Sequence, residues 1–222
     1  MRFIIEFEGL ITDIAPAHYR SHREAASAVG WSRLDAASFR RLTRTKGDDA
    51  NFLPGAKPNK VEQYRARFAE WIESDDLFVE TPMQDGVVER LRSLARFGAC
   101  SPVTLGTNLE ARRRAIDRFG ISDAVERLAA LSLDPRRRPT ELRALAGDDP
   151  RALVVASTDV LIRSADAADL FTVGVSSGDC TGVRLHRAGA RVVYPDLAAL
   201  VASLRSGAGD LIDAGMLPPP IG

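Results

Sequence analysis

Polar side chains that could carry out chemistry follow the apolar runs of this 222-residue chain. They fall in four short segments, residues 6–12, 104–108, 134–138 and 156–161. Glu6 and Glu8 occupy the first segment, and a carboxylate can in principle act as a nucleophile. Arg138 ends the third, and an arginine can hold an anion through two parallel hydrogen bonds. These residue types indicate either nucleophilic chemistry or anion binding.

The elements that must position these segments alternate between short apolar runs and amphipathic helical patterns. Strands that alternate with helices of about 10 to 15 residues indicate a parallel sheet with right-handed crossovers. Ligands of such sheets bind outside the carboxyl ends of the strands, where the four segments lie. The expected strands cover 3–7, 102–105, 128–133, 152–156, 171–175 and 191–194, and the expected helices cover 86–97, 109–119, 139–146, 160–168 and 196–204.

The part of the chain between residues 14 and 80 shows no strand pattern. Helical patterns cover 16–29, 36–45 and 59–72, and a loop rich in Gly, Pro, Asp and Asn covers 46–58. We therefore expect an α/β core from residues 1–13 and 81–206, with residues 14–80 inserted as a helical cap. The tail, 207–222, contains three consecutive prolines and is expected to be loosely held.

The opening segment FIIEFEGLITDIAPAHYRSHREAASAVG resembles the start of the haloacid dehalogenase superfamily, in particular β-phosphoglucomutase and the phosphoglycolate phosphatases. Gly9, Thr12 and Asp13 match that pattern, and His18 falls where phosphoglucomutase-like members carry a hinge histidine. The later segment VGVSSGDCTGVRLHRAGARVVYPDLAALVASL is also similar to the family. The resemblance implies a Rossmann-like parallel sheet core with an inserted helical cap, and a hinge at Asp13 and His18.

The two catalytic acids of the family are replaced by longer ones in this chain. In the family the first aspartate attacks phosphorus and the second acts as general acid and base; Glu6 and Glu8 occupy those positions. The extra methylene moves each carboxylate by about 1.5 Å, and a displacement on the order of 1 Å can lower a rate about a hundredfold. The resemblance implies that an active chain would use Glu6 and Glu8 for catalysis, at a rate lowered by the displacement of their carboxylates.

The metal-binding acids of the family are also replaced. The resemblance implies a Mg²⁺ site at Glu6, Glu8 and the position of Ser157, but Ser157 and Leu161 stand where the family carries two acids. Mg²⁺ prefers carboxylate oxygens in octahedral geometry, which a serine matches poorly and a leucine does not provide. We expect Mg²⁺ as cofactor only if the chain is active, and otherwise no cofactor. Asp159 is close by, but it equally suits the start of a helix.

The phosphate-binding positions of the family are better matched. Thr107 and Asn108 fit by residue type, and Thr104 fits about as well by spacing; a capping box between Thr107 and Glu110 is an equal alternative. Arg138 precedes a proline as the family lysine commonly does, and an arginine can hold a phosphate. A solvated basic loop is the alternative for Arg138. The resemblance thus implies phosphate binding by Thr107, Asn108 and Arg138.

Composition narrows the class of protein further. Thirty basic residues balance thirty acidic ones, so no overall field attracts nucleic acid or an anionic membrane, and most arginines suit solvated helix faces. Cys100 and Cys180 have no metal-binding spacing, which favours reduced thiols. No run approaches the roughly 20 apolar residues of a membrane span, and no signal peptide pattern is present. We expect a cytoplasmic protein.

Three functions remain open at this point. The first is a non-catalytic or very weak protein that uses the old pocket for binding or regulation, with a small phosphorylated molecule or an unknown protein as partner. The second is a Mg²⁺-dependent phosphatase or phosphomutase that uses Glu6 as nucleophile on a small phosphorylated metabolite. The third is a structural subunit. The losses at Ser157 and Leu161 favour the first.

Overall fold

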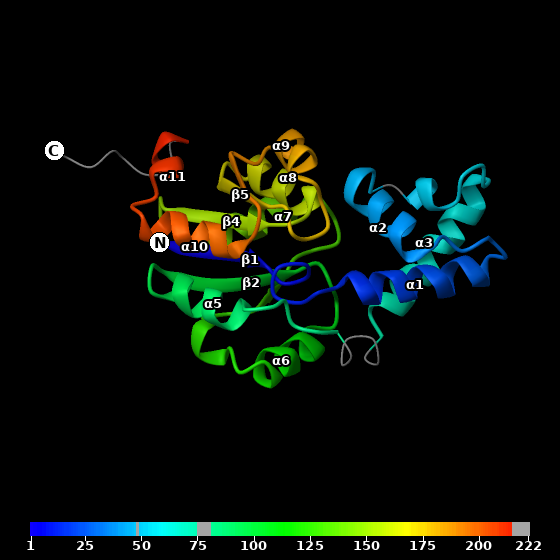
Figure 1. The fold of residues 1–222 in the computed structure, drawn as a ribbon, viewed down its shortest axis with the longest axis horizontal. Helices are drawn as coiled ribbons and strands as arrows, with labels where there is room; N and C mark the ends of the chain where they lie inside the picture. The colour runs from blue at the N-terminus through cyan, green and yellow to red at the C-terminus, as the bar shows by residue number, and fades with distance from the viewer. Residues whose placement is uncertain (48, 75–80, 215–222) are drawn as a thin grey trace.

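The structure, a computed structural model, describes residues 1–47, 49–74 and 81–214. Its centre is a six-stranded parallel sheet in the order β3-β2-β1-β4-β5-β6 (Figure 1). β1 lies between β2 and β4, so its carboxyl end is flanked by the ends of both neighbours. The strands are β1 (Arg2–Glu6), β2 (Ala99–Thr104), β3 (Ala129–Ala130), β4 (Ala152–Ala156), β5 (Phe171–Val175) and β6 (Val192–Tyr194). The α/β class with a parallel sheet is confirmed.

Helices cover both faces of the sheet, because alternate side chains of each strand point to opposite faces. Phe3 and Ile5 of β1 belong to one buried cluster, and Ile4 belongs to another. The first cluster includes side chains of α5 (Val87–Ala95), α6 (Leu109–Arg118), η2 (Ser122–Ala124), α10 (Leu197–Arg205) and α11 (Gly209–Asp213). The second includes side chains of α7 (Arg138–Ala146), α8 (Asp159–Ala167) and α9 (Gly182–Ala188). Burial on both faces explains the continuous apolar run of β4.

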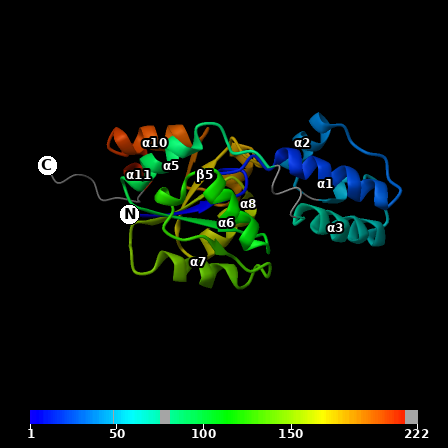
Figure 2. The same cartoon turned by 90° about the horizontal axis from the view of Figure 1, so that it is seen from below.

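A helical unit stands beside this core, as Figure 2 shows. It consists of α1 (Ala15–Ala28), α2 (Ala36–Thr45), η1 (Asp49–Phe52) and α3 (Pro58–Ile72). The unit has its own buried cluster, centred on Phe39, Phe52 and Tyr64. His22 is fully buried there, with Nδ1 2.9 Å from the Tyr64 hydroxyl. Its packing is therefore largely independent of the packing of the sheet.

Two neighbouring segments connect the helical unit to the core. The Asp13 amide donates to the Pro82 carbonyl at 2.8 Å, and Thr12 forms an antiparallel bridge with Met83. The turn before them needs glycine at position 9, because its φ is +84° and a Cβ there would lie 2.5 Å from the Ser157 hydroxyl. The turn that follows β1 is thus fitted closely against the segment that follows β4.

Most expected elements are present, and two helices differ from expectation. The bounds of α2 and β5 agree with the predicted ranges, whereas β3 is limited to two residues. The helix α9 was not expected, since only Leu185 and Ala188 of its seven residues are buried. The expectation of a loosely held tail is wrong for α11, whose Leu211 is fully buried and whose Asp210 accepts a hydrogen bond from the Tyr194 hydroxyl at 2.5 Å. Residues 75–80 and 215–222, the latter including the three prolines, lie outside the described residues.

Two further sequence expectations can be compared with the described residues. Across that part of the chain, every helix is too short or too polar to cross a membrane. Cys100 and Cys180 are both buried and do not form a disulfide.

Candidate functional site

A cavity of about 310 Å³ lies between the carboxyl edge of the sheet and the helical unit. Acidic, hydroxyl and apolar side chains share its wall. Of the predicted site residues, Glu6, Glu8, Thr104, Thr107 and His18 all line it. The rule that ligands bind outside the carboxyl ends of the strands, here called the strand-end rule, thus brings Glu6, Glu8, Thr104 and Thr107 to one space, whereas His18 reaches it from α1.

Glu6 ends β1 and is bound by the segment that follows β4. Its Oε2 accepts from the Ser157 amide at 2.6 Å, from the Ser157 hydroxyl at 3.0 Å and from the Thr158 amide at 3.0 Å. Its Oε1 accepts from the Thr158 hydroxyl. The side chain is almost fully buried, so these four neutral donors take the place of water.

Burial raises the pKa of the Glu6 carboxyl to about 7, and the nearby charge of Asp179 adds to this effect. The Ser157 and Thr158 donors favour the charged form and reduce the rise in pKa, but they do not cancel it. Within residues 1–47, 49–74 and 81–214, the hydrogen-bond donors to this carboxylate are all neutral. Glu6 is therefore partly protonated near neutral pH.

Glu8 is held by different partners. Its Oε1 accepts from the Thr104 hydroxyl at 2.7 Å and from Arg112 Nε at 2.8 Å. Arg112 lies on α6, and only 2% of this residue is exposed. The Thr104 hydroxyl also accepts the Gly106 amide at 2.8 Å, which fixes the turn after β2. Glu8 thus lies in a tight ion pair rather than as a free acid or base.

The two residues before α6, together with Arg112 of its first turn, form a site for an anion. Its donors are the Thr107 and Asn108 amides, the Thr107 hydroxyl and the Arg112 guanidinium, which together we name the anion cradle. Glu73, directly after α3, occupies it: Oε2 accepts from the two amides at 3.0 and 3.2 Å, from the hydroxyl at 3.2 Å and from Arg112 Nη1 at 3.1 Å. A carboxylate of the helical unit therefore sits where the sequence predicts phosphate binding.

The charge of Arg112 sets the protonation of Glu73. Burial alone would raise the pKa of the Glu73 carboxyl, but the Arg112 guanidinium and the Thr107 and Asn108 amides outweigh it. The pKa of Glu73 accordingly lies below its ordinary value. Glu73 is an anion at neutral pH, and Arg112 connects it to Glu8.

The residues around Glu6 do not fit a Mg²⁺ ion. Donor hydrogens of Ser157 and Thr158 already point at the carboxylate, whereas a metal would need lone pairs there. Leu161 is buried and lines the cavity with carbon atoms only. Among residues 1–47, 49–74 and 81–214, no group of three or more His, Cys, Asp or Glu is arranged to hold a metal ion.

The structure corrects the assignment of Arg138 to phosphate binding. Arg138 Nε donates to the Ser132 carbonyl at 2.7 Å and Nη2 donates to the Leu133 carbonyl at 2.6 Å. The side chain is buried in these contacts and does not line the cavity. Its predicted alternative, a solvated basic loop, is also wrong for Arg138, because the guanidinium holds the loop before α7 in place.

The capping alternative for Thr107 is wrong as well. The N-cap of α6 is Asn108, whose Oδ1 accepts from the Ala111 amide at 3.0 Å. Glu110 lies on the surface beside Arg113. Thr107 and Thr104 both have a place at the site, since Thr104 binds Glu8 and Thr107 binds Glu73.

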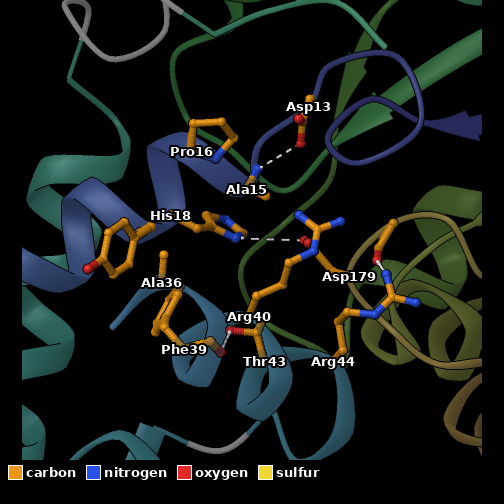
Figure 3. A pocket seen from close by; sticks show the side chains of 12 residues that line it. Asp13, Ala15, Pro16, His18, Ala36, Phe39, Arg40, Thr43, Arg44 and Asp179 are labelled. Atoms are coloured by element: carbon orange, nitrogen blue, oxygen red, sulfur yellow. Dashed lines mark hydrogen bonds and ion pairs between the residues drawn. The ribbon is translucent and has the colours of Figure 1, made fainter. Parts of the chain in front are cut away.

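The predicted hinge residues lie at a second cavity, of about 210 Å³, between α1, α2 and the core (Figure 3). Asp13 Oδ1 accepts from the Ala15 amide at 3.2 Å at the start of α1. His18 points toward Asp179, with 3.7 Å between Nδ1 and Oδ2. His18 and Asp179 line both cavities, so the two spaces meet at this pair.

A second set of contacts attaches the helical unit at α2. Arg44 donates to the Ser176 carbonyl at 2.8 Å and to the Gly178 carbonyl at 2.5 Å. Arg184 of the core donates to the Thr43 carbonyl and to Asp159, each at 2.6 Å. Asp159 thus serves an ion pair in addition to its place at the start of α8.

Sequence reasoning missed three residues of this site: Glu73, Arg112 and Asp179. Asp179 follows β5, so the strand-end rule would have found it had that strand been included. Arg112 belongs to a run of three arginines, and nothing local distinguishes it from exposed Arg113. Glu73 lies far from the sheet in sequence, and only the tertiary structure brings it to α6.

No family model and no curated protein matches this chain. Several solved structures, however, match it in fold. A haloacid dehalogenase-like family hydrolase from Streptococcus pneumoniae superposes with a TM-score of 0.73 at 10% identity, over 91% of this chain and 97% of that one. A predicted phosphoglycolate phosphatase from Haemophilus somnus gives 0.66 at 16% identity, over 91% and 96%. A provisionally assigned β-phosphoglucomutase from Thermotoga maritima gives 0.60 at 18% identity, over 92% and 98%. The chain therefore has the haloacid dehalogenase-like fold.

Proposed function

We propose that this chain is a haloacid dehalogenase-like protein that binds a small phosphorylated molecule between its core and a helical cap without transferring the phosphate. The cap corresponds to the helical unit. The observation that carries the proposal is the state of Glu6, the counterpart of the family nucleophile. Its carboxylate accepts four neutral hydrogen bonds from Ser157 and Thr158 and is partly protonated near neutral pH. Hydrogen bonds that a carboxylate accepts occupy the lone pairs with which it would attack phosphorus, so this arrangement holds Glu6 as an acceptor rather than as a nucleophile.

The surroundings of Glu6 support the same conclusion. In phosphoryl transfer the protein acts mainly by positioning groups and by neutralising charge with metal ions. Here Ser157 and Leu161 supply no carboxylate at the two positions where the family binds its metal, and Glu8 is tied to Arg112. The cavity keeps polar groups able to recognise an anion, chiefly those of the anion cradle. Binding is thus better supported than turnover.

The test is hydrolysis of p-nitrophenyl phosphate by the wild-type chain, with and without Mg²⁺. We expect no turnover above that of the Glu6→Ala variant under either condition. A Mg²⁺-dependent rate that disappears in Glu6→Ala would overturn the proposal. A variant with aspartate restored at positions 6, 8, 157 and 161 serves as the companion, and we expect it to gain Mg²⁺ binding.

One observation favours the alternative, a Mg²⁺-dependent phosphatase or phosphomutase that uses Glu6. Glu6, Glu8 and Asp179 line the same cavity, so three acids border the space where a cation would be needed. Asp179 would then substitute for the acid missing at Ser157. In an Asp179→Asn variant this alternative predicts loss of the Mg²⁺-dependent rate, whereas the binding proposal predicts no rate to lose.

A further inference from the structure

Glu73 makes the contacts that an external anion would make at the anion cradle. One of its oxygens, Oε2, accepts from two consecutive backbone amides, a hydroxyl and Arg112, and Oε1 lies 3.3 Å from Arg112 Nη2. Backbone amides at a helix start together with an arginine form a favourable site for phosphate. A phosphate and the Glu73 carboxylate therefore cannot both use these donors.

We propose that Glu73 is an internal ligand of the anion cradle, and that a phosphate group binds there only by displacing it. This inference rests on the proposed function, since it concerns the same cavity. Glu73 belongs to the helical unit and its donors belong to the core, so the bond is also an attachment between the two. Occupation of the cradle by Glu73 is an autoinhibitory contact.

The position of Glu73 suits a displaceable ligand. It follows the last turn of α3, and 27% of its side chain is exposed. The donors are held more firmly: the Arg112 side chain is buried and is also bound to Glu8, and Asn108 caps α6. When Glu73 leaves, its carboxylate can reach water, whereas the cradle keeps its shape for the next anion.

The release of Glu73 would loosen one side of the helical unit. The other side remains attached, because Arg44 and Arg184 bond across the interface at α2 without using Glu73 or the cradle. Phosphate binding is therefore expected to free the α3 end while the α2 end stays in contact. The exposed Trp71 lies two residues before Glu73, and in a Trp31→Phe background its fluorescence is expected to report this change.

The test is a titration of the full chain with inorganic phosphate, followed by calorimetry and by Trp71 fluorescence. An internal competitor lowers apparent affinity by the fraction of time that it leaves the site open. We expect Glu73→Ala to bind phosphate about tenfold more tightly than wild type. Glu70→Ala is the matched control, because Glu70 lies on the same helix in an exposed pair with Arg67. It should bind like wild type.

Equal or weaker phosphate binding by Glu73→Ala would overturn the inference. If that variant does not fold, Glu73→Gln keeps the size of the side chain and removes its charge. A smaller gain is then expected, and no gain is again contradictory. Amide chemical shifts of Thr107 and Asn108 in wild type give an independent readout, since phosphate should move both.

The inference and the proposed function fail in different ways. Turnover of p-nitrophenyl phosphate by Glu73→Ala, with tighter phosphate binding, would refute the non-catalytic proposal and leave the autoinhibitory contact standing. Unchanged phosphate binding without turnover would refute only the autoinhibitory contact.

Discussion

Glu6 and Glu73 line the same cavity, but their carboxylates are stabilised by different chemistry. In the part of the chain that the structure describes, the partners of Glu6 are neutral amides and hydroxyls, and burial raises its pKa to about 7. Glu73 accepts similar amides and in addition pairs with Arg112, and its pKa is lowered. Two acids with comparable hydrogen bonds therefore differ in charge near neutral pH, because Glu73 has Arg112 beside it whereas the described partners of Glu6 are neutral.

This difference explains what each acid does for the fold. Ionising Glu6 costs free energy in the folded state, since hydrogen bonds do not replace a metal or an arginine. Ionised Glu73 instead strengthens the attachment of the helical unit to the core. Arg112 pairs with Glu8 and Glu73.

The largest effect is expected from Arg112→Ala, which removes the shared cation of Glu8 and Glu73. Breaking a buried ion pair leaves uncompensated charges, so we expect a loss of about 4 kcal/mol in the free energy of unfolding. Urea denaturation at pH 7 measures it. The control is Arg113→Ala, the exposed neighbour on α6, which should change stability little. Equal losses in both variants would show that Arg112 has no special role.

The second prediction concerns Glu6→Gln, which keeps the shape of the side chain and removes its charge. Because the folded pKa is raised from 4.5 to about 7, the cost of ionisation is absent below pH 4.5, grows up to pH 7 and is complete above it. We expect the variant to exceed wild type by roughly 3 kcal/mol at pH 8 and by little at pH 4. Denaturation curves across this range measure the difference. A difference that does not depend on pH would contradict the assigned protonation.

The third prediction concerns Glu73→Gln, which should lower stability where Glu6→Gln raises it. Glu73 has a lowered pKa, so its contribution to stability is present above its unfolded value of about 4.5 and is lost as the pH falls through the folded pKa. We expect Glu73→Gln to lower the free energy of unfolding by about 1 kcal/mol at pH 7 and by less at pH 3. Glu70→Gln on the same helix serves as the control. A Glu73→Gln variant as stable as wild type at pH 7 would contradict the attachment.

The comparison also shows what the sequence can and cannot predict. The buried run of β4 and the position of Glu6 after β1 follow from local pattern, because a strand buried on both faces is apolar and ends where ligands bind. From the sequence, Ser157 could be identified only as a position where an acid of the family is missing, and not as a hydrogen-bond donor to Glu6. That Ser157 would donate to Glu6 depends on how closely two turns approach, which pattern does not reveal.

The Glu73 side of the site could not be predicted in this way. Arg112 and Arg113 have the same residue type and adjacent positions, yet one is buried in an ion pair and the other is exposed. Glu73 reaches the start of α6 only because the helical unit stands at the carboxyl edge of the sheet. Arg138 shows the opposite error. Its place before a proline matches that of the family lysine, but its guanidinium binds carbonyl groups of the loop before α7.

The most direct test of the account is the titration of the Glu6 carboxyl carbon by NMR, with and without 10 mM Mg²⁺. If Ser157 and Thr158 occupy the carboxylate in place of a metal, its pKa should lie near 7 in both conditions. The Glu6→Gln spectrum identifies the resonance. A pKa that falls to its ordinary value or below when Mg²⁺ is added would show that the ion binds Glu6, and would contradict the account.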